Sequence, residues 1–396
     1  MHPKHSISIY STCKSSRSKK QFLESLATDL HKIGITCALH QQGKKLEFKV
    51  CLRPFEPSEI LELMKKERAI RLQRQKAFIQ QMEAQGAFCF LLEGKTLVPM
   101  HIKPRLQFCN SPKEHNLFNL YGAFQSVPAP SLRYRRLAVL VRDDGHNGSP
   151  IMGIFGLSSC FYSLGCRDRF LGWVGAENRQ LKNKGLNSCM QLSICMALPP
   201  YSYIRVGRLL AALAASNVIA NEFSRRYSSR EQRNELRAIV TTCASGLHAP
   251  IFNRIMLVPG GLYKRIGETV GYSTLFFSKE TLAAARILVR EQEGACSSIT
   301  ARSVRTLKMA LNICGIPRER LLRFGISKGV YLAAGGLQSI EYLRGTINEA
   351  ITTWPTVEQI VSYWKSRDLP KALADDKHVR AMTEFRPEEF IQSLKS

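Results

Sequence analysis

The fold is decided by residues 190–223, which read MQLSICMALPPYSYIRVGRLLAALAASNVIANEF. Residues 190–198 form an apolar run of strand length, and Pro199-Pro200 ends it. After Gly207, residues 208–223 have the leucine and alanine content of a helix that packs on a sheet. The segment therefore predicts a strand followed by a packed helix.

The sequence on either side completes a sheet. Residues 236–242 are another buried strand, so the order is strand, helix, strand, with a short segment at 251–255 after it. Upstream, residues 137–141 and 151–157 are apolar strands joined by the turn residues of 143–148, which is typical of a hairpin. We expect an α+β or α/β fold with a central mixed sheet and flanking helices.

Three regions of the chain differ in composition and in residue pattern. Residues 1–87 are a basic α+β segment, with strand alternation at 46–52 and one long helix expected over 58–86. Residues 88–285 carry the central sheet, and residues 286–396 have helical patterns. The sequence therefore predicts a basic N-terminal region, a central domain and a helical C-terminal region.

The chain is strongly basic. Lysine and arginine total 57 and aspartate and glutamate 31, which gives a formal charge of +26. Hydrophobic residues make up 44%, so the chain can bury a core, and collagen-like or wholly disordered classes are excluded. Such a charge is best tolerated beside a polyanion, so nucleic acid is the first partner to consider. The alternative is that the charge serves solubility alone.

No secretory or membrane segment is expected from the sequence. The first twenty residues are basic and lack an apolar core, and no run approaches the roughly 18 apolar residues of a membrane span. The twelve cysteines are spread singly, without a C-x2-C pair, and no two histidines stand four residues apart. We expect a cytoplasmic protein with neither disulfides nor a bound metal.

Arg167, Asp168 and Trp173 form the first candidate site. An aspartate between Arg167 and Arg169 is expected to stay ionised. It could orient an arginine toward a phosphate, since a guanidinium held by a carboxylate is a preorganised bidentate donor. The alternative is a structural ion pair that closes a turn beneath Trp173.

Arg205, Gly207 and Arg208 form the second candidate, at the junction of strand and helix. Backbone N–H groups and two arginines at a helix start suit an anion. The junction resembles that of GNAT-type acyltransferases, where such a loop holds the pyrophosphate of coenzyme A. Because Arg205 lies two residues before Gly207 and the next small residue comes late, the loop is degenerate. We therefore expect no cofactor, with a coenzyme A-type ligand as an open alternative, and Gly207 could serve helix packing alone.

The third candidate lies where the strand at 236–242 ends. Thr241 and Thr242, followed by Asn253 and Arg254, bring polar groups to one edge of the sheet, where ligands of open α/β sheets bind. Substrate positioning is a better interpretation than nucleophilic catalysis, because spacing alone reveals no triad order. Catalytic residues therefore stay unassigned.

Lys65 and Arg68 lie on the basic face of the helix expected after Pro57. They could follow the phosphates of a nucleic acid, or they could simply face solvent.

Several short motifs stand in a fixed order over roughly residues 100–290, about half the chain: Pro104-Arg105-Leu106, residues 153–157, Arg167-Asp168 through Gly172-Trp173, Pro199-Pro200-Tyr201, Val240-Thr241-Thr242, Asn253-Arg254 and residues 266–271. This ordered set resembles the DruA family of the bacterial Druantia anti-phage defence systems. The resemblance implies a cytoplasmic bacterial protein that restricts phage infection together with other Druantia components, including a large helicase-like protein. It implies no particular reaction.

The charge and the resemblance together favour a nucleic-acid-binding subunit of an anti-phage complex. The strand, helix, strand order keeps a second hypothesis open, a GNAT-like enzyme that modifies nucleic acid. In that case Arg205, Gly207 and Arg208 hold the cofactor phosphate, and Thr241, Thr242 and Asn253 lie near the acceptor. A third hypothesis is an assembly scaffold whose basic faces meet acidic partner proteins.

Overall fold

The computed structural model describes residues 7–52, 57–125, 134–229, 234–243, 250–269, 277–293, 303–317, 321 and 328–393. The chain forms two compact units: unit 1 takes residues 1–67 and 270–327, and unit 2 takes residues 68–269 and 328–396. Each unit is therefore built from two separate stretches of sequence. The boundaries expected at 87/88 and 285/286 rest on changes in composition and residue pattern along the sequence, and they stay predictions.

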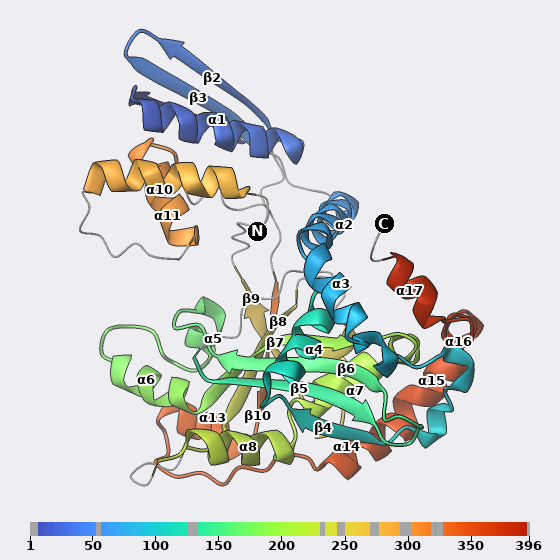
Figure 1. The fold of residues 1–396 in the computed structure, drawn as a ribbon. Coiled ribbons are helices and arrows are strands. Elements are labelled where there is room, and N and C mark those ends of the chain that lie inside the picture. Colours follow the sequence, from blue (N-terminus) through green and yellow to red (C-terminus); the bar gives the residue numbers. More distant parts are fainter. Residues whose placement is uncertain are drawn as a thin grey trace. The chain divides into compact units, whose positions relative to one another are not determined.

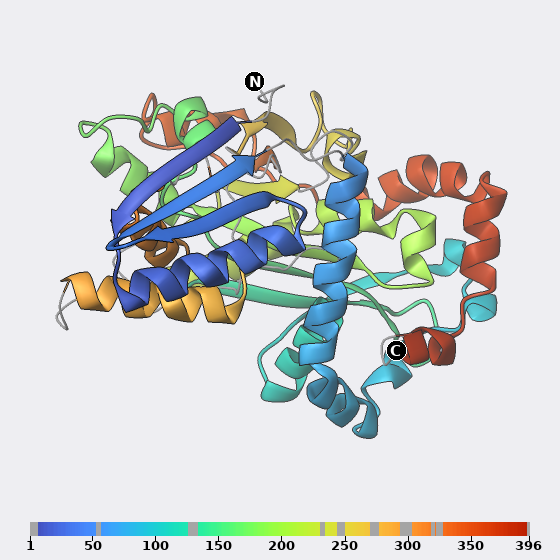
Figure 2. The same cartoon turned by 90° about the horizontal axis from the view of Figure 1, so that it is seen from above.

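Unit 1 is a three-stranded antiparallel sheet packed with helices (Figure 2). In the order β1-β3-β2, the strands are β1 (Ile7–Lys14), β3 (Lys45–Leu52) and β2 (Thr36–Gln42). The helices of its core are α1 (Arg17–Lys32), α10 (Lys279–Glu293) and α11 (Ser303–Ile313). Alternation in β3 buries Leu46, Phe48 and Val50 and leaves Glu47 and Lys49 exposed, as the sequence predicts.

A buried carboxylate ties the two stretches of unit 1 together. Asp29 of α1 is 2% exposed. Its Oδ2 accepts from the backbone N–H of Ser278 at 2.7 Å and from the hydroxyl of Thr281 at 2.6 Å. Because these donors lie at the start of α10, the negative charge of Asp29 also complements the positive end of that helix.

Unit 2 is built on a seven-stranded mixed sheet in the order β4-β5-β6-β7-β8-β10-β9 (Figure 1). Neighbouring strands are antiparallel except for β7 and β8, which are parallel. The strands are β4 (Pro104–Phe108), β5 (Arg136–Asp143), β6 (Ile151–Ser159), β7 (Cys189–Ala197), β8 (Ala238–Cys243), β9 (Lys264–Glu268) and β10 (Gly329–Ala334). The sheet confirms the expected α+β fold class, and β5 and β6 form the expected hairpin.

Helices cover both faces of this sheet. On one face, Val139, Phe155 and Ile239 pack with α7 (Val206–Leu213) and its neighbours in the largest core cluster. On the other face, Leu140 and Val240 belong to two smaller clusters. Around the largest cluster lie α8 (Asn217–Tyr227), α9 (Pro250–Asn253) and α14 (Val357–Tyr363), and the opposite face carries α3 (Lys76–Ala84), α4 (Pro112–Gly122), α5 (Gly165–Phe170), α6 (Arg179–Asn187) and α13 (Leu337–Arg344).

Two stretches expected as single helices are each divided in two. The helix expected over 58–86 is α2 (Pro57–Arg74) followed by α3, with a break at Gln75. The helix expected over 208–223 is α7 followed by α8, where Ser216 starts the second helix from an extended conformation. Serine favours such starts over helix interiors, which accounts for the second break.

The two parallel strands part within the sheet. β7 and β8 pair only from Cys189 to Leu192, opposite Ala238 to Thr241, although β7 continues to Ala197. At the parting point Ser193 is an extra residue in the register between β6 and β7, which makes it a β-bulge. Parallel strands are usually buried on both faces, whereas the ends of β7 and β8 beyond this point are half-buried, apart from the buried Ile194.

The C-terminal residues are helical, as expected. After α14 the chain forms a π-helical turn, η5 (Trp364–Asp368), and then α15 (Leu369–Leu373), α16 (Asp376–Thr383) and α17 (Pro387–Ser393). Short 3-10 turns occur at η1 (Ala87–Phe90), η2 (Gly94–Thr96), η3 (Pro99–His101) and η4 (Tyr201–Ile204). In the part of the chain that the structure describes, no helix is both long and apolar enough to span a membrane.

Candidate functional site

Arg167 and Asp168 form a buried ion pair within α5. Arg167 is fully buried, and its Nε and Nη2 donate to Oδ1 of Asp168 at 2.9 and 2.6 Å. The remaining guanidinium donors reach the backbone oxygens of Phe161 at 2.8 Å and Tyr162 at 3.0 Å. The guanidinium of Arg167 is therefore turned into the protein, and its N–H groups hold the loop before α5.

A second cation completes this cluster. Lys182 of α6 donates to Oδ2 of Asp168 at 2.8 Å, and the backbone N–H of Leu164 donates to the same oxygen at 3.2 Å. The indole of Trp173 lies beside Arg167, and its Nε1 donates to the backbone oxygen of Leu343 at 2.7 Å. We call Arg167, Asp168 and Lys182 the buried charge cluster; it carries two positive charges and one negative charge.

A pocket of about 460 Å³ opens above the buried charge cluster. Two exposed arginines, Arg169 of α5 and Arg179 at the start of α6, stand at its wall. Tyr162 and Val174 at the pocket are 52% and 55% exposed. The complete lining is Tyr162, Gly165, Asp168, Arg169, Trp173, Val174, Gly175, Ala176, Arg179 and Lys182.

The surface around this pocket is basic. Phe170 lies between two cations, since the Nζ of Lys264 and the guanidinium of Arg344 are 5.4 and 5.1 Å from the centre of its ring. Lys184 lies over the ring of Tyr342 at 4.7 Å. These contacts join α5, α6, β9 and α13 into one surface. We call its exposed cations the basic face: Arg169, Arg179, Lys184, Lys264 and Arg344.

The second sequence candidate lies on the opposite face of the sheet. Arg205, with φ of 61°, precedes α7, and its backbone oxygen accepts from Nε1 of Trp364 at 3.3 Å. Arg208 Nη1 donates to Oδ1 of Asp368 at 2.6 Å, in a pair whose side chains are 11% and 4% exposed. Nothing crowds Gly207, since an added Cβ would meet only Ile251 at 3.9 Å. A carboxylate of the protein itself therefore holds the arginine that the sequence suggests for a phosphate.

The third candidate is divided between the end of β8 and α9. Thr241 is buried, and its hydroxyl donates to the backbone oxygen of Leu192 at 3.0 Å, at the last rung between β7 and β8. Thr242 is half-buried beyond it, at the parting of the strands, and Asn253 and Arg254 are exposed. Phe252 anchors α9 through ring contacts with Tyr263 and Tyr331. The structure therefore does not bring the three sequence candidates to one cleft.

Lys65 and Arg68 lie on α2. Lys65 is exposed and pairs with Glu62 one turn earlier, at 2.7 Å. Arg68 is half-buried.

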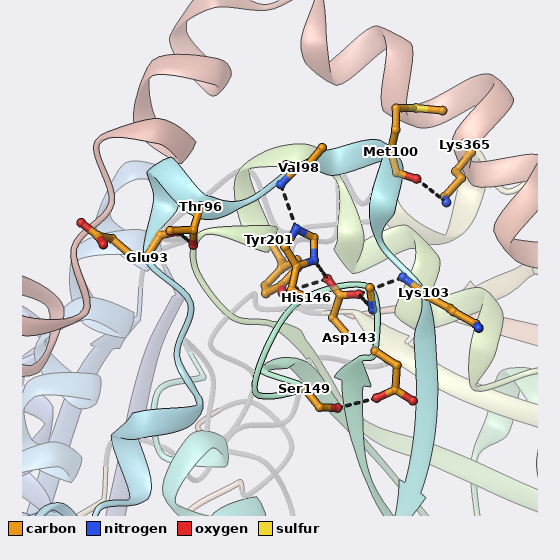
Figure 3. Close-up of polar contacts among 12 residues, drawn as sticks. Glu93, Thr96, Val98, Met100, Lys103, Asp143, His146, Ser149, Tyr201 and Lys365 are labelled. Atoms are coloured by element: carbon orange, nitrogen blue, oxygen red, sulfur yellow. Dashed lines mark hydrogen bonds and ion pairs between the residues drawn. The ribbon is translucent and has the colours of Figure 1, made fainter.

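A polar cluster that sequence reasoning missed surrounds Asp143 (Figure 3). Asp143 is fully buried and accepts four hydrogen bonds, two of them from the backbone N–H groups of Lys103 at 2.8 Å and Gly145 at 3.0 Å. The Nδ1 of His146 lies 2.8 Å and the hydroxyl of Tyr201 3.0 Å from its Oδ2. The backbone N–H of Val98 donates to Nε2 of His146 at 2.9 Å, so the proton of the imidazole lies on Nδ1 and points to Asp143. Every polar group here has a partner, which makes the cluster structural.

Burial also determines the reactivity of the thiols in the part of the chain that is described. Burial raises the pKa of Cys195 to about 12 and that of Cys160 to about 11, so neither is an activated thiolate at neutral pH. The described cysteines form no disulfide. Within the same residues, no group of three or more His, Cys, Asp or Glu side chains is placed to hold a metal ion.

The fold and the site define a mixed α+β protein with a basic, aromatic-bearing surface around a pocket. The family model described as "Druantia protein DruA" matches residues 55–345. A Druantia protein DruA from Escherichia coli (strain UMEA 4076-1) is 26% identical over 343 residues, covering 78% of this chain and 83% of the relative. No solved structure matches the chain. The chain belongs to the DruA family of the Druantia anti-phage system.

Proposed function

We propose that this protein is a nucleic-acid-binding subunit of its Druantia system and that it acts in the cytoplasm with a helicase-like partner. The observation that carries the proposal is the basic face. Residues 165–187, β9 and α13 hold eight lysines and arginines but four acidic residues. One of these acids, Asp168, is buried and already paired with two cations. Without the buried charge cluster, six exposed lysines and arginines of these segments stand against three exposed acids, so the exposed surface keeps a net positive charge.

The composition of the basic face suits a phosphate backbone. Exposed lysines and arginines gain affinity by releasing the counterions of a polyanion, whatever its sequence. Aromatic rings between them add surfaces on which bases stack. Phe161 and Tyr162, at 51% and 52% exposed, are two aromatic rings near the pocket that a base can reach.

The double substitution Lys184→Glu/Lys264→Glu tests the basic face. We expect affinity for a duplex or single-stranded oligonucleotide to fall about tenfold or more at moderate salt, because two phosphate contacts are lost. The slope of log K against log salt should decrease by about two. Fluorescence anisotropy over a salt series measures both quantities.

The matched control is Lys371→Glu/Lys377→Glu, which makes the same charge change at exposed lysines of α15 and α16. It should leave affinity and slope close to those of the unmodified protein. Equal losses in both variants would show that total charge, and not the basic face, attracts the nucleic acid. Tight capture of sibling subunits in the presence of nuclease, without oligonucleotide binding, would favour a scaffold instead.

A GNAT-like acyltransferase is the second candidate function. It is favoured by the parallel pair of β7 and β8, which are connected through α7 and α8. The two strands separate after Leu192. The half-buried strand ends there include Thr242, while Asn253 lies on the next helix along the chain. Against it stands the ion pair of Arg208 with Asp368, which must open before Arg208 can meet a cofactor phosphate.

Thermal-shift measurements with acyl-coenzyme A species test this second function. Saturation at about 100 times Kd should stabilise the fold by about 2.7 kcal/mol and raise Tm accordingly. ATP is the control, because it carries phosphates without the pantetheine arm. Equal shifts with ATP, or none across the panel, would reject the acyltransferase.

A further inference from the structure

We propose that the pocket between α5 and α6 binds one unpaired nucleotide of a nucleic acid, with its phosphate at Arg169 and Arg179 and its base against Tyr162. This inference rests on the proposed nucleic-acid binding and names the part of the polyanion that is recognised. Its physical basis is the combination of a concave site, uncommitted positive charge and an open aromatic ring.

The size of the pocket fits a small organic ligand. At about 460 Å³ it lies within the range of roughly 300–1,000 Å³ that such sites occupy. Trp173, Val174 and Ala176 supply apolar surface, while charged groups stand at the same wall. A nucleotide combines the same two features, a flat apolar base and an anionic phosphate.

The positive charge at the pocket is available to a ligand. Arg169 and Arg179 are exposed, and neither guanidinium has a hydrogen-bond or ion-pair partner within the described residues. The carboxylate at the pocket floor, Asp168, is neutralised by Arg167 and Lys182. Glu177, the other acid of this loop, contacts Asn178 and is not part of the lining. An incoming phosphate therefore meets two free arginines over a cluster that is itself positive.

Tyr162 supplies a surface for a base. One side of its ring is occupied by Lys182, whose Nζ is 4.5 Å from the ring centre, yet half of the residue remains exposed. A base that stacks on tyrosine is recognised through its π face, so any of the four bases can occupy such a site. The adjacent exposed Phe161 extends this apolar surface.

The pocket is also preorganised. Arg167 fixes the backbone at Phe161 and Tyr162, and Trp173 is fixed by its bond to Leu343. Gly175, with φ of 94°, turns the loop at the pocket where a residue with a Cβ would be strained. Because these groups are already ordered, little conformational entropy is lost when a ligand binds.

Recognition of this kind requires an unpaired nucleotide. In a duplex the bases are stacked and paired, so their faces cannot reach Tyr162 in a pocket. A base that is unpaired at an overhang, gap or bulge can enter at small cost, and a flipped base enters at the cost of unstacking. The pocket therefore discriminates between paired and unpaired strands, whereas the basic face alone does not.

The test compares a duplex that carries one unpaired nucleotide with a fully paired duplex of the same length. We expect the unmodified protein to prefer the unpaired form by about tenfold or more, the effect of one stacked base. Tyr162→Ala should remove this preference and leave affinity for the paired duplex intact. Arg169→Ala/Arg179→Ala should remove the preference too, with a modest loss on both duplexes because these residues also belong to the basic face.

The control variant is Arg386→Ala, an exposed arginine outside the basic face, which should retain the preference. A nucleoside monophosphate should compete with the unpaired nucleotide for the pocket and so abolish the preference for the unpaired form. Inorganic phosphate should compete much more weakly if the base contributes. Binding without any preference would overturn this inference while leaving the proposed function intact. A different result would overturn the proposed function: no oligonucleotide binds, but the unmodified protein still binds the monophosphate and the Tyr162→Ala variant does not. The ligand of the pocket would then be a free nucleotide.

Discussion

Asp168→Ala is expected to lower the free energy of unfolding by about 3–5 kcal/mol. The carboxylate accepts from Nε and Nη2 of Arg167, from Lys182 and from a backbone N–H, and all of these donors are buried or nearly so. Without it, the positive charges of Arg167 and Lys182 remain close together, and the guanidinium of Arg167 is fully buried. Uncompensated buried charge is among the largest single-residue penalties known for proteins. Urea denaturation followed by circular dichroism measures the loss.

Asp376→Ala is the matched control, since it removes the same carboxylate from an exposed position in α16. Its cost should stay within about 1 kcal/mol. A second variant, Lys182→Met, removes one cation and keeps the length of the side chain. In the Asp168→Ala background it should cost less than it does alone, because the lysine has lost its partner. An Asp168→Ala protein as stable as the Asp376→Ala control would contradict the charge argument.

Asp143→Ala is expected to cost about 3–5 kcal/mol as well, for a different reason. It leaves the fully buried hydroxyl of Tyr201 without an acceptor, together with the Nδ1 proton of His146 and two backbone N–H groups that are partly buried. Burial, and then the charge of Asp143, raise the pKa of Tyr201 far above its usual range, so its phenol is a donor at neutral pH. Thermal and urea denaturation measure the change.

The neighbouring residue supplies the control for this prediction. Asp144 is exposed and pairs with Arg105 at 2.6 Å, so Asp144→Ala should cost about 1 kcal/mol or less. Asp143→Asn should fall between the two, because an amide oxygen accepts some of the same bonds without the negative charge. Equal stability of the Asp143→Ala and Asp144→Ala proteins would contradict the structural role of the cluster.

Much of the sheet could be predicted because several of its strands can be recognised from the local sequence alone. The hairpin β5/β6, the strand β7 and the strand β8 are apolar runs that end at turn residues or prolines. By contrast, β10 is a six-residue strand in a stretch whose residue pattern is otherwise typical of helices, and it lies between β8 and β9 in the sheet. Its run of Val, Tyr and Leu before Gly335-Gly336 was the available signal, but pairing with distant strands decides its conformation.

The candidate sites could be predicted only in part. The sequence indicates that Arg167 and Asp168 interact, and it offers the ion pair beneath Trp173 as one interpretation, but burial decides which groups face a ligand. The neighbours Arg169 and Arg179 are the exposed cations, and nothing in their local sequence separates them from Arg167. Tyr201 meets Asp143 only through the fold, so the polar cluster has no sequence signature beyond the turn at Asp143 and His146.

The division of unit 1 into two stretches has a consequence for synthesis of the protein. The first fifty or so residues are made early, yet their buried apolar face is completed by α10 and α11, which leave the ribosome only after residue 313. The strand β10, which joins β9 to the rest of the sheet, follows still later, at 329–334. Neither hydrophobic core is closed until most of the chain has been translated, so during synthesis both must be kept from premature contacts. A message cut short before α10 yields neither unit of this protein, and one cut short before β10 yields no finished unit 2.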